Sequence, residues 1–307
     1  MSTVKEIMKK PIVIENSATI SHAIHKLLDL KISRLLTTND EGKIIGIITE
    51  KDIGFFLLTN KTEKNLDEIS ISEISHPLIE VSESTPVEDV AHIMYTKNTG
   101  SVGVSYSETV GIVTKTDLAR YYIQNYVGHK RVGDAMTVSY SAMYQDDKLY
   151  QILEKMIQDK VSRLIIKDKE NHAVGVITFG DVFRLSLSMG QESDVVDNSD
   201  PAISVIFPRH GFLSETGFGG TTIAKDVMSD CITSVDYNDD LVTACTEMID
   251  NDINGCGVLI NGKLSGIISK TDVIKVLAGL RNHSKWLYFT LFFSYWIYNL
   301  GVDFVEK

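Results

Sequence analysis

Residues 46–52 read Gly46-Ile47-Ile48-Thr49-Glu50-Lys51-Asp52, and this phrase recurs three more times along the chain. Its pattern is a glycine, two β-branched apolar residues, a hydroxyl residue, two variable residues and an aspartate. The other copies are Gly111-Ile112-Val113-Thr114-Lys115-Thr116-Asp117, Gly175-Val176-Ile177-Thr178-Phe179-Gly180-Asp181 and Gly266-Ile267-Ile268-Ser269-Lys270-Thr271-Asp272. Because the copies follow one another at intervals of 65, 64 and 91 residues, the chain is built from an internal repeat.

Each phrase closes a longer unit whose opening also recurs. A short extended segment, an amphipathic helix and two apolar strands joined by a polar turn separate the opening from the phrase, and a final helix begins at the hydroxyl residue. The pattern predicts an α/β (α+β) fold of four β-α-β-β-α units, each with a core too small to be stable alone. The openings are Val4-Lys5-Glu6-Ile7-Met8, Ile71-Ser72-Glu73-Ile74-Ser75, Val132-Gly133-Asp134-Ala135-Met136 and Ala224-Lys225-Asp226-Val227-Met228.

Two local signals place elements within the units. Asn261-Gly262 lies between apolar runs, which is the strongest short-range indication of a β-hairpin. In unit two we expect Thr85 to be the N-cap of a helix, Pro86 its first residue and Glu88 the acidic partner of a capping box.

The opening words, the hairpin and the closing phrase together make each unit similar to the CBS (cystathionine β-synthase) domain. The resemblance implies that paired units form Bateman modules, that two modules form a disc, and that clefts between units bind AMP, ADP, ATP or S-adenosylmethionine. The layout is similar to the γ subunit of AMP-activated kinase. We expect units at 1–60, 68–125, 129–187 and 223–283, an inserted linker at 188–222 and an aromatic tail at 284–307.

The phrase suits a nucleotide on physical grounds as well. A helix N-terminus offers unpaired N–H groups and a partial positive charge to a phosphate. A hydroxyl at the cap can donate to an anion, and an aspartate one turn later can accept hydrogen bonds from a ribose diol. The same Ser/Thr-x-x-Asp pattern is also an ordinary capping box, so both roles stay open for each copy.

The four sites are not expected to be equal. Arg34 and Arg163 stand at the first hairpin strand of units one and three, where family members often direct an arginine at ligand phosphates; pairing with surface acids is the alternative. Arginine can engage phosphate with two hydrogen bonds and keeps its charge. Units two and four have no arginine there, so their phrases bind nucleoside parts, borrow an arginine across the disc or stay empty. The candidate ligand-binding sets are Arg34/Thr49/Asp52, Arg163/Thr178/Asp181, Thr114/Thr116/Asp117 and Ser269/Thr271/Asp272.

Composition narrows the class of protein. A net charge of −11 and a pI of about 5.2 argue against broad nucleic-acid binding, which needs surplus basic residues. Residues 1–20 carry no secretory signal. The three cysteines lie in unit four without Cys-x-x-Cys spacing, so we expect buried thiols in a cytoplasmic protein and no metal site. Without a nucleophile–base constellation, we expect no enzyme and no cofactor beyond a regulatory nucleotide.

Two segments fall outside the repeat. The middle of the insert, residues 203–213, is apolar enough to dock on a module, where Arg209 and His210 would contact a ligand; a packed linker is the alternative. The tail has 17 uncharged residues from Trp286 to Val302, at the lower limit for a transmembrane helix. It also suits a helix at a membrane surface, a helix packed on protein or across a homodimer, or a poorly ordered end.

The leading hypothesis is a regulatory sensor of adenosine nucleotides that signals to a partner protein through rearrangement of its modules. The alternative is a non-catalytic structural scaffold, membrane-associated through residues 284–307. The sequence does not identify the nucleotide, the regulated protein or the oligomeric state.

Overall fold

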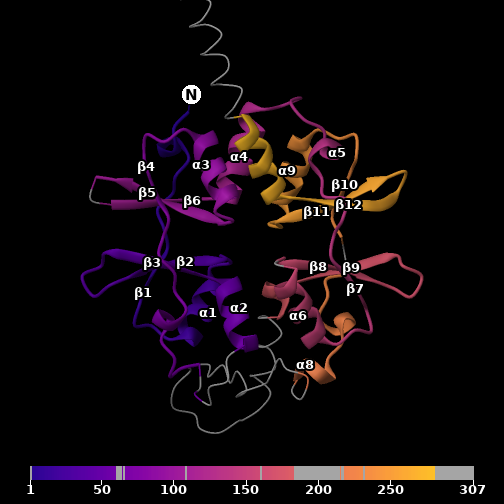
Figure 1. Ribbon diagram of the computed structural model, residues 1–307, viewed down its shortest axis with the longest axis horizontal. Helices are drawn as coiled ribbons and strands as arrows, with labels where there is room; N and C mark the ends of the chain where they lie inside the picture. The colour runs from indigo at the N-terminus through magenta and orange to yellow at the C-terminus, as the bar shows by residue number, and fades with distance from the viewer. Residues whose placement is uncertain are drawn as a thin grey trace, which may run out of the picture.

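The computed structural model describes residues 2–59, 64, 66–107, 109–159, 161–182, 215, 218–230 and 232–280. These residues contain four three-stranded sheets, one in each repeat unit (Figure 1). In every sheet the first strand pairs parallel with the middle strand, and the third strand pairs antiparallel with it. This arrangement confirms the predicted α/β repeat.

The helices and strands recur in the same order in each unit. Unit one contains η1 (Val4–Glu6), β1 (Val13–Glu15), α1 (Ile20–Asp29), β2 (Arg34–Thr38), β3 (Ile44–Thr49) and α2 (Glu50–Thr59). Unit two contains η2 (Ile71–Glu73), β4 (Glu80–Ser82), α3 (Val87–Thr96), β5 (Ser101–Tyr106), β6 (Thr109–Thr114) and α4 (Lys115–Asn125). Unit three contains α5 (Val132–Ala135), β7 (Ala142–Tyr144), α6 (Leu149–Gln158), β8 (Arg163–Lys167), β9 (Ala173–Thr178) and helical residues 179–182. After α8 (Phe218–Thr221), unit four contains η3 (Ala224–Asp226), β10 (Ser234–Asp236), α9 (Leu241–Asp250), β11 (Gly255–Ile260), β12 (Lys263–Ser269) and helical residues 270–280.

The β11–β12 hairpin turns at Asn261 and Gly262, both with positive φ (50° and 75°), which confirms the prediction from the sequence.

The predicted start of α3 is wrong by one residue: Pro86 is the N-cap, and no side chain caps the helix. The carbonyl of Thr85 instead accepts the N–H of Val4 at 2.8 Å, so this segment serves to hold the start of the chain. Glu88 accepts hydrogen bonds from tyrosine hydroxyls of unit two.

The opening segment of each unit crosses to its neighbour. Lys9 of unit one pairs with Ile112 of unit two, and His76 of unit two pairs with Ile47 of unit one. Units three and four make the same exchange through Thr137 with Ile267 and Ser229 with Val176. Units one and two therefore interlock as one module, and units three and four as another.

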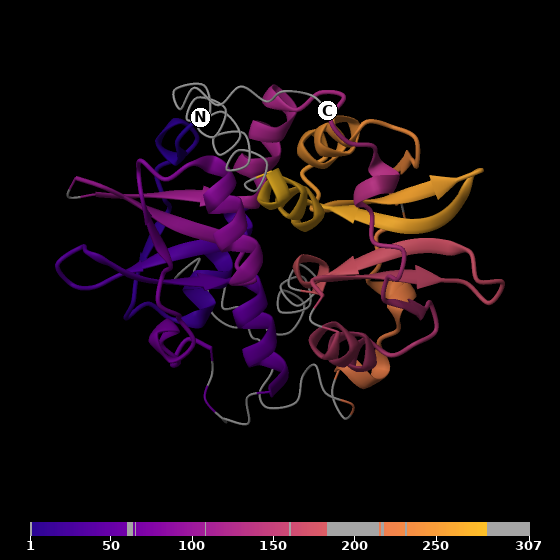
Figure 2. The ribbon, with the colours of Figure 1, turned by 45° about the horizontal axis from the view of Figure 1, so that its top comes forward.

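Two hydrophobic cores join the modules. Units two and four share one core, and units one and three share the other. In the first core α4 packs against α9, and both figures show these helices side by side where the modules meet (Figures 1 and 2). The four units thus occupy the four quadrants of one body (Figure 1), which is the disc arrangement predicted for two modules.

Several predictions concern residues beyond the described part of the chain. These are the tail 284–307 and most of the insert 188–222, including Arg209 and His210. At the end of the insert, α8 contacts α6 of unit three, and the carbonyl of Thr222 accepts the N–H of Leu149 at 3.0 Å. Within the described residues, none of the helices combines the length and apolar character needed to cross a membrane.

Candidate functional site

The four phrases share one local geometry. In each, a strand ends at the hydroxyl residue and a helix begins directly after it. The hydroxyl and the backbone N–H of that residue both donate to the Oδ2 atom of the aspartate three residues later, at 2.6 Å from the hydroxyl and 2.8–2.9 Å from the N–H. The predicted pairs are therefore brought together as helix caps: Thr49 with Asp52, Thr114 with Asp117, Thr178 with Asp181, and Ser269 with Asp272.

The cap uses one carboxylate oxygen and turns the other toward the neighbouring unit. The Oδ1 atom of Asp52 lies 3.0 Å from Nε2 of His76, and that of Asp272 accepts a hydrogen bond from the Thr137 hydroxyl at 3.1 Å. Both partners belong to the opening segment that crosses over from the other unit of the module. A ligand that reaches these aspartates must therefore enter the cleft between two units.

The arginines begin beside their own phrase but reach into the neighbouring unit. Arg34 is paired with Thr49, and Arg163 with Thr178, across adjacent strands. A Cβ atom built on Gly100 of unit two would lie 2.8 Å from Nη1 of Arg34, and one built on Gly255 of unit four would lie 2.4 Å from Nη1 of Arg163. Each guanidinium thus occupies space that a glycine in the next unit leaves open.

Both guanidinium groups are largely shielded from water. Burial lowers the pKa of the Arg34 and Arg163 guanidinium groups, because the charged form is removed from water. The Nη1 atom of Arg34 is buried and makes no hydrogen bond within the described residues, whereas Nε and Nη2 donate to the Ser33 hydroxyl. A buried donor of this kind favours binding of an acceptor such as a phosphate oxygen.

A pocket lies between units three and four. Arg163, Ile165 and Val176 line it from unit three, and unit four contributes mainly apolar residues such as Ile253 together with Ser269 at the end of β12. Small-molecule sites combine apolar walls with a few polar groups in this way. The structure therefore groups Arg163 with the phrase of unit four as well as with Thr178.

Two lysines that the sequence reasoning missed link the phrases of units two and four. Lys115 donates from Nζ to the Thr271 hydroxyl at 2.7 Å, and Lys270 donates to the Thr116 hydroxyl at 3.1 Å. The predicted ligand residues Thr116 and Thr271 are thus partners of lysines from the opposite module. The only signal in the sequence was that a lysine stands directly after the hydroxyl residue in both phrases.

Burial and nearby like charges lower the pKa of both lysines to about 8. Desolvation is the largest cause for each, and Arg34 and Arg163 add repulsion. Cations from all four units therefore influence one another around the centre of the molecule. Such a site attracts anions.

Comparison with known proteins agrees with this architecture. The family model described as the CBS domain matches residues 4–57, 71–124, 132–188 and 224–279. Protein MJ1225 of Methanocaldococcus jannaschii is 27% identical over 195 residues, covering 59% of this chain and 69% of that protein. Its crystal structure, described as that of a proposed archaeal homolog of γ-AMPK, matches with a TM-score of 0.73 and 22% identity over 90% of this chain and 100% of that chain.

Two further matches cover different extents of the chain. A conserved protein from Pyrococcus horikoshii matches in structure with a TM-score of 0.58 and 19% identity, over 90% of this chain and 100% of that chain. The L-aspartate semialdehyde sulfurtransferase of M. jannaschii is 34% identical over 125 residues, covering 40% of this chain and 23% of that enzyme. This chain thus spans about a quarter of the enzyme's length. The four domain matches and the fold show that the chain belongs to the CBS domain family, with four CBS domains in two interlocked pairs.

Proposed function

We propose that the protein is a regulatory sensor that binds an adenosine nucleotide in the cavity between units three and four. The observation that carries the proposal is the combination of apolar walls with Arg163 and Ser269 in one pocket. The apolar walls suit the flat face of adenine, and a buried guanidinium suits an anionic group.

The phrase of unit four supplies the remaining groups. Helical residues 270–280 begin directly after Ser269, so the partial positive charge of this helix N-terminus lies beside the pocket. The Lys270 N–H itself already donates to the Asn254 carbonyl at 3.0 Å. The Oδ1 atom of Asp272 accepts a hydrogen bond from the Thr137 hydroxyl at 3.1 Å, and we infer that it can also accept one from a ribose hydroxyl. An anion beside Arg163 would also offset the desolvation of that side chain.

A second site in the other module follows from the same arrangement. Arg34 reaches Gly100 of unit two as Arg163 reaches Gly255 of unit four, and its buried Nη1 atom lacks a hydrogen bond within the described residues. We therefore assign Arg34 to a second nucleotide site between units one and two, with Asp52 of unit one as the candidate ribose acceptor.

A regulatory role is supported by the domains that the chain contains and by its relatives. All four matched regions are CBS domains, and MJ1225 is described as a proposed homolog of γ-AMPK. A nucleotide would act by favouring one arrangement of the two modules over another, which requires different affinities for the two arrangements. The receiver of the signal would be a partner protein in the cytoplasm.

Calorimetric titration of ligand-free protein with AMP, ADP, ATP and S-adenosylmethionine tests the proposal. We expect binding of at least one of them, and we expect Arg163→Met to weaken it about 10- to 100-fold, since a hydrogen bond to a charged group contributes about 1.5–3 kcal/mol. Arg131→Met is the matched control, because Arg131 lies in the same module with its side chain exposed. Absence of heat with all four ligands, or equal affinity in Arg163→Met, would contradict the proposal.

A further inference from the structure

One position differs among the four repeats and, in three of them, places a side chain against the aspartate of the phrase. The position lies in the opening segment that crosses to the neighbouring unit. Its residue forms a backbone bridge to the residue that follows the glycine of the neighbour's phrase. In each case the two residues exchange N–H···O hydrogen bonds, so the position is the same in all four clefts. The occupants are His76 opposite unit one, Lys9 opposite unit two, Ser229 opposite unit three and Thr137 opposite unit four.

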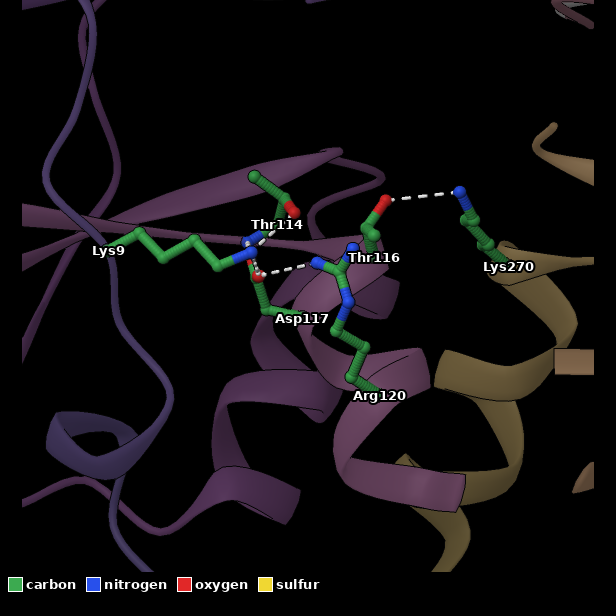
Figure 3. Close-up of polar contacts among 6 residues, drawn as sticks. All are labelled: Lys9, Thr114, Thr116, Asp117, Arg120 and Lys270. Carbon is green, nitrogen blue, oxygen red and sulfur yellow. Dashed lines mark hydrogen bonds and ion pairs between the residues drawn. The ribbon is translucent and has the colours of Figure 1, made fainter. Parts of the chain in front are cut away.

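In unit two this position carries a positive charge. Figure 3 shows Lys9 extending from the crossing segment to Asp117, with its Nζ 2.6 Å from Oδ1. Arg120 of α4 approaches the same oxygen at 3.7 Å. Because Thr114 donates twice to Oδ2, both oxygens of this carboxylate have partners. The Asp117 side chain is only 3% exposed, whereas that of Lys9 is 54% exposed.

The equivalent position in unit four is chemically different. Thr137 meets Oδ1 of Asp272 with a neutral hydroxyl, which can donate or accept and can rotate toward an incoming ribose hydroxyl. A lysine ammonium only donates. A ribose diol at Asp117 would have to displace this ammonium and take its place against a buried carboxylate.

We propose that Lys9 prevents a nucleoside from binding at the phrase of unit two. The residue at this bridge position thereby determines which of the four phrases accept a ribose. The inference rests on the proposed function, since it concerns the same class of ligand. It assigns Asp117 a structural role, which is to hold the start of the chain on unit two through Lys9. Asp272, which faces a threonine hydroxyl in place of a lysine, is the aspartate that we expect to accept a ribose.

A reciprocal exchange of the two residues tests the selection rule. The number of AMP molecules bound at saturation is counted by native mass spectrometry for the wild type, Lys9→Thr and Thr137→Lys. We expect Lys9→Thr to bind one more AMP than the wild type and Thr137→Lys to bind one fewer. Lys9→Arg retains the charge and should keep the wild-type number, and Lys10→Thr removes a neighbouring exposed charge and should also leave the number unchanged.

The outcomes separate this inference from the proposed function. If the wild type binds AMP but neither exchange changes the number bound, the rule is wrong and the nucleotide function stands. If neither the wild type nor any variant binds AMP, ADP, ATP or S-adenosylmethionine, the proposed function is wrong, and the selection rule is wrong as well. Circular dichroism establishes that each variant folds; should Lys9→Thr unfold, an unchanged number in Thr137→Lys alone overturns the rule.

Discussion

At the scale of single residues, two lysines destabilise the folded protein when they are charged. Lys115 and Lys270 have pKa values of about 8 in the folded protein, against a usual 10.5. Between these two values the unfolded chain binds more protons than the folded chain, so the stability contribution of both residues rises with pH. It is fully present above pH 10.5 and lost as the pH falls to about 8.

We predict that replacing both lysines by methionine stabilises the protein most at low pH. The melting temperature of the double variant, minus that of the wild type, should fall steadily as the pH is raised from 7 to about 10. Lys130→Met serves as a control, because Lys130 is exposed. A difference that stays constant with pH would show that the folded lysines titrate normally.

Contacts between single residues could be predicted from the sequence where the chemistry is local. The Thr/Ser–Asp pairs are three residues apart, so helix geometry alone brings Thr49 to Asp52. The path of Arg163 was not predictable, because it depends on Gly255 in another unit. The same holds for the partners of Lys115, which lie in the opposite module.

At the scale of elements, the exchange of opening segments makes each unit depend on its neighbour. Ile71 belongs to unit two in sequence, yet it is fully buried in the core shared by units one and three. Val4, Val132 and Ala224 are exchanged in the same way. The recurring words indicated that the segment exists, but a repeat pattern contains no information on which neighbour receives it.

We predict that Ile71→Ala destabilises the protein by about 2–5 kcal/mol and does so through unit one. Hydrogen exchange followed by mass spectrometry should show faster exchange in β2 and β3 than in β5 and β6. Ile45→Ala is the control, since Ile45 is 46% exposed and its truncation should leave both sheets unchanged. Faster exchange confined to unit two would mean that the segment packs on its own unit.

At the scale of the whole molecule, four marginal units become one body through two shared cores. Each core contains helices from both modules, and the Lys115–Thr271 and Lys270–Thr116 hydrogen bonds join the modules beside α4 and α9. A ligand between units three and four therefore lies close to the contacts that hold the modules together. The fold followed from the fourfold repeat, whereas the pairing of units two and four needed the structure.

The most direct test of the nucleotide site is a crystal structure of the protein grown with AMP. The account predicts adenine between the apolar walls formed by Ile165, Val176 and Ile253, with the phosphate on Arg163. It also predicts that Asp117 remains paired with Lys9 and carries no ribose. An empty cavity beside Arg163, with AMP bound elsewhere or not at all, would contradict the account.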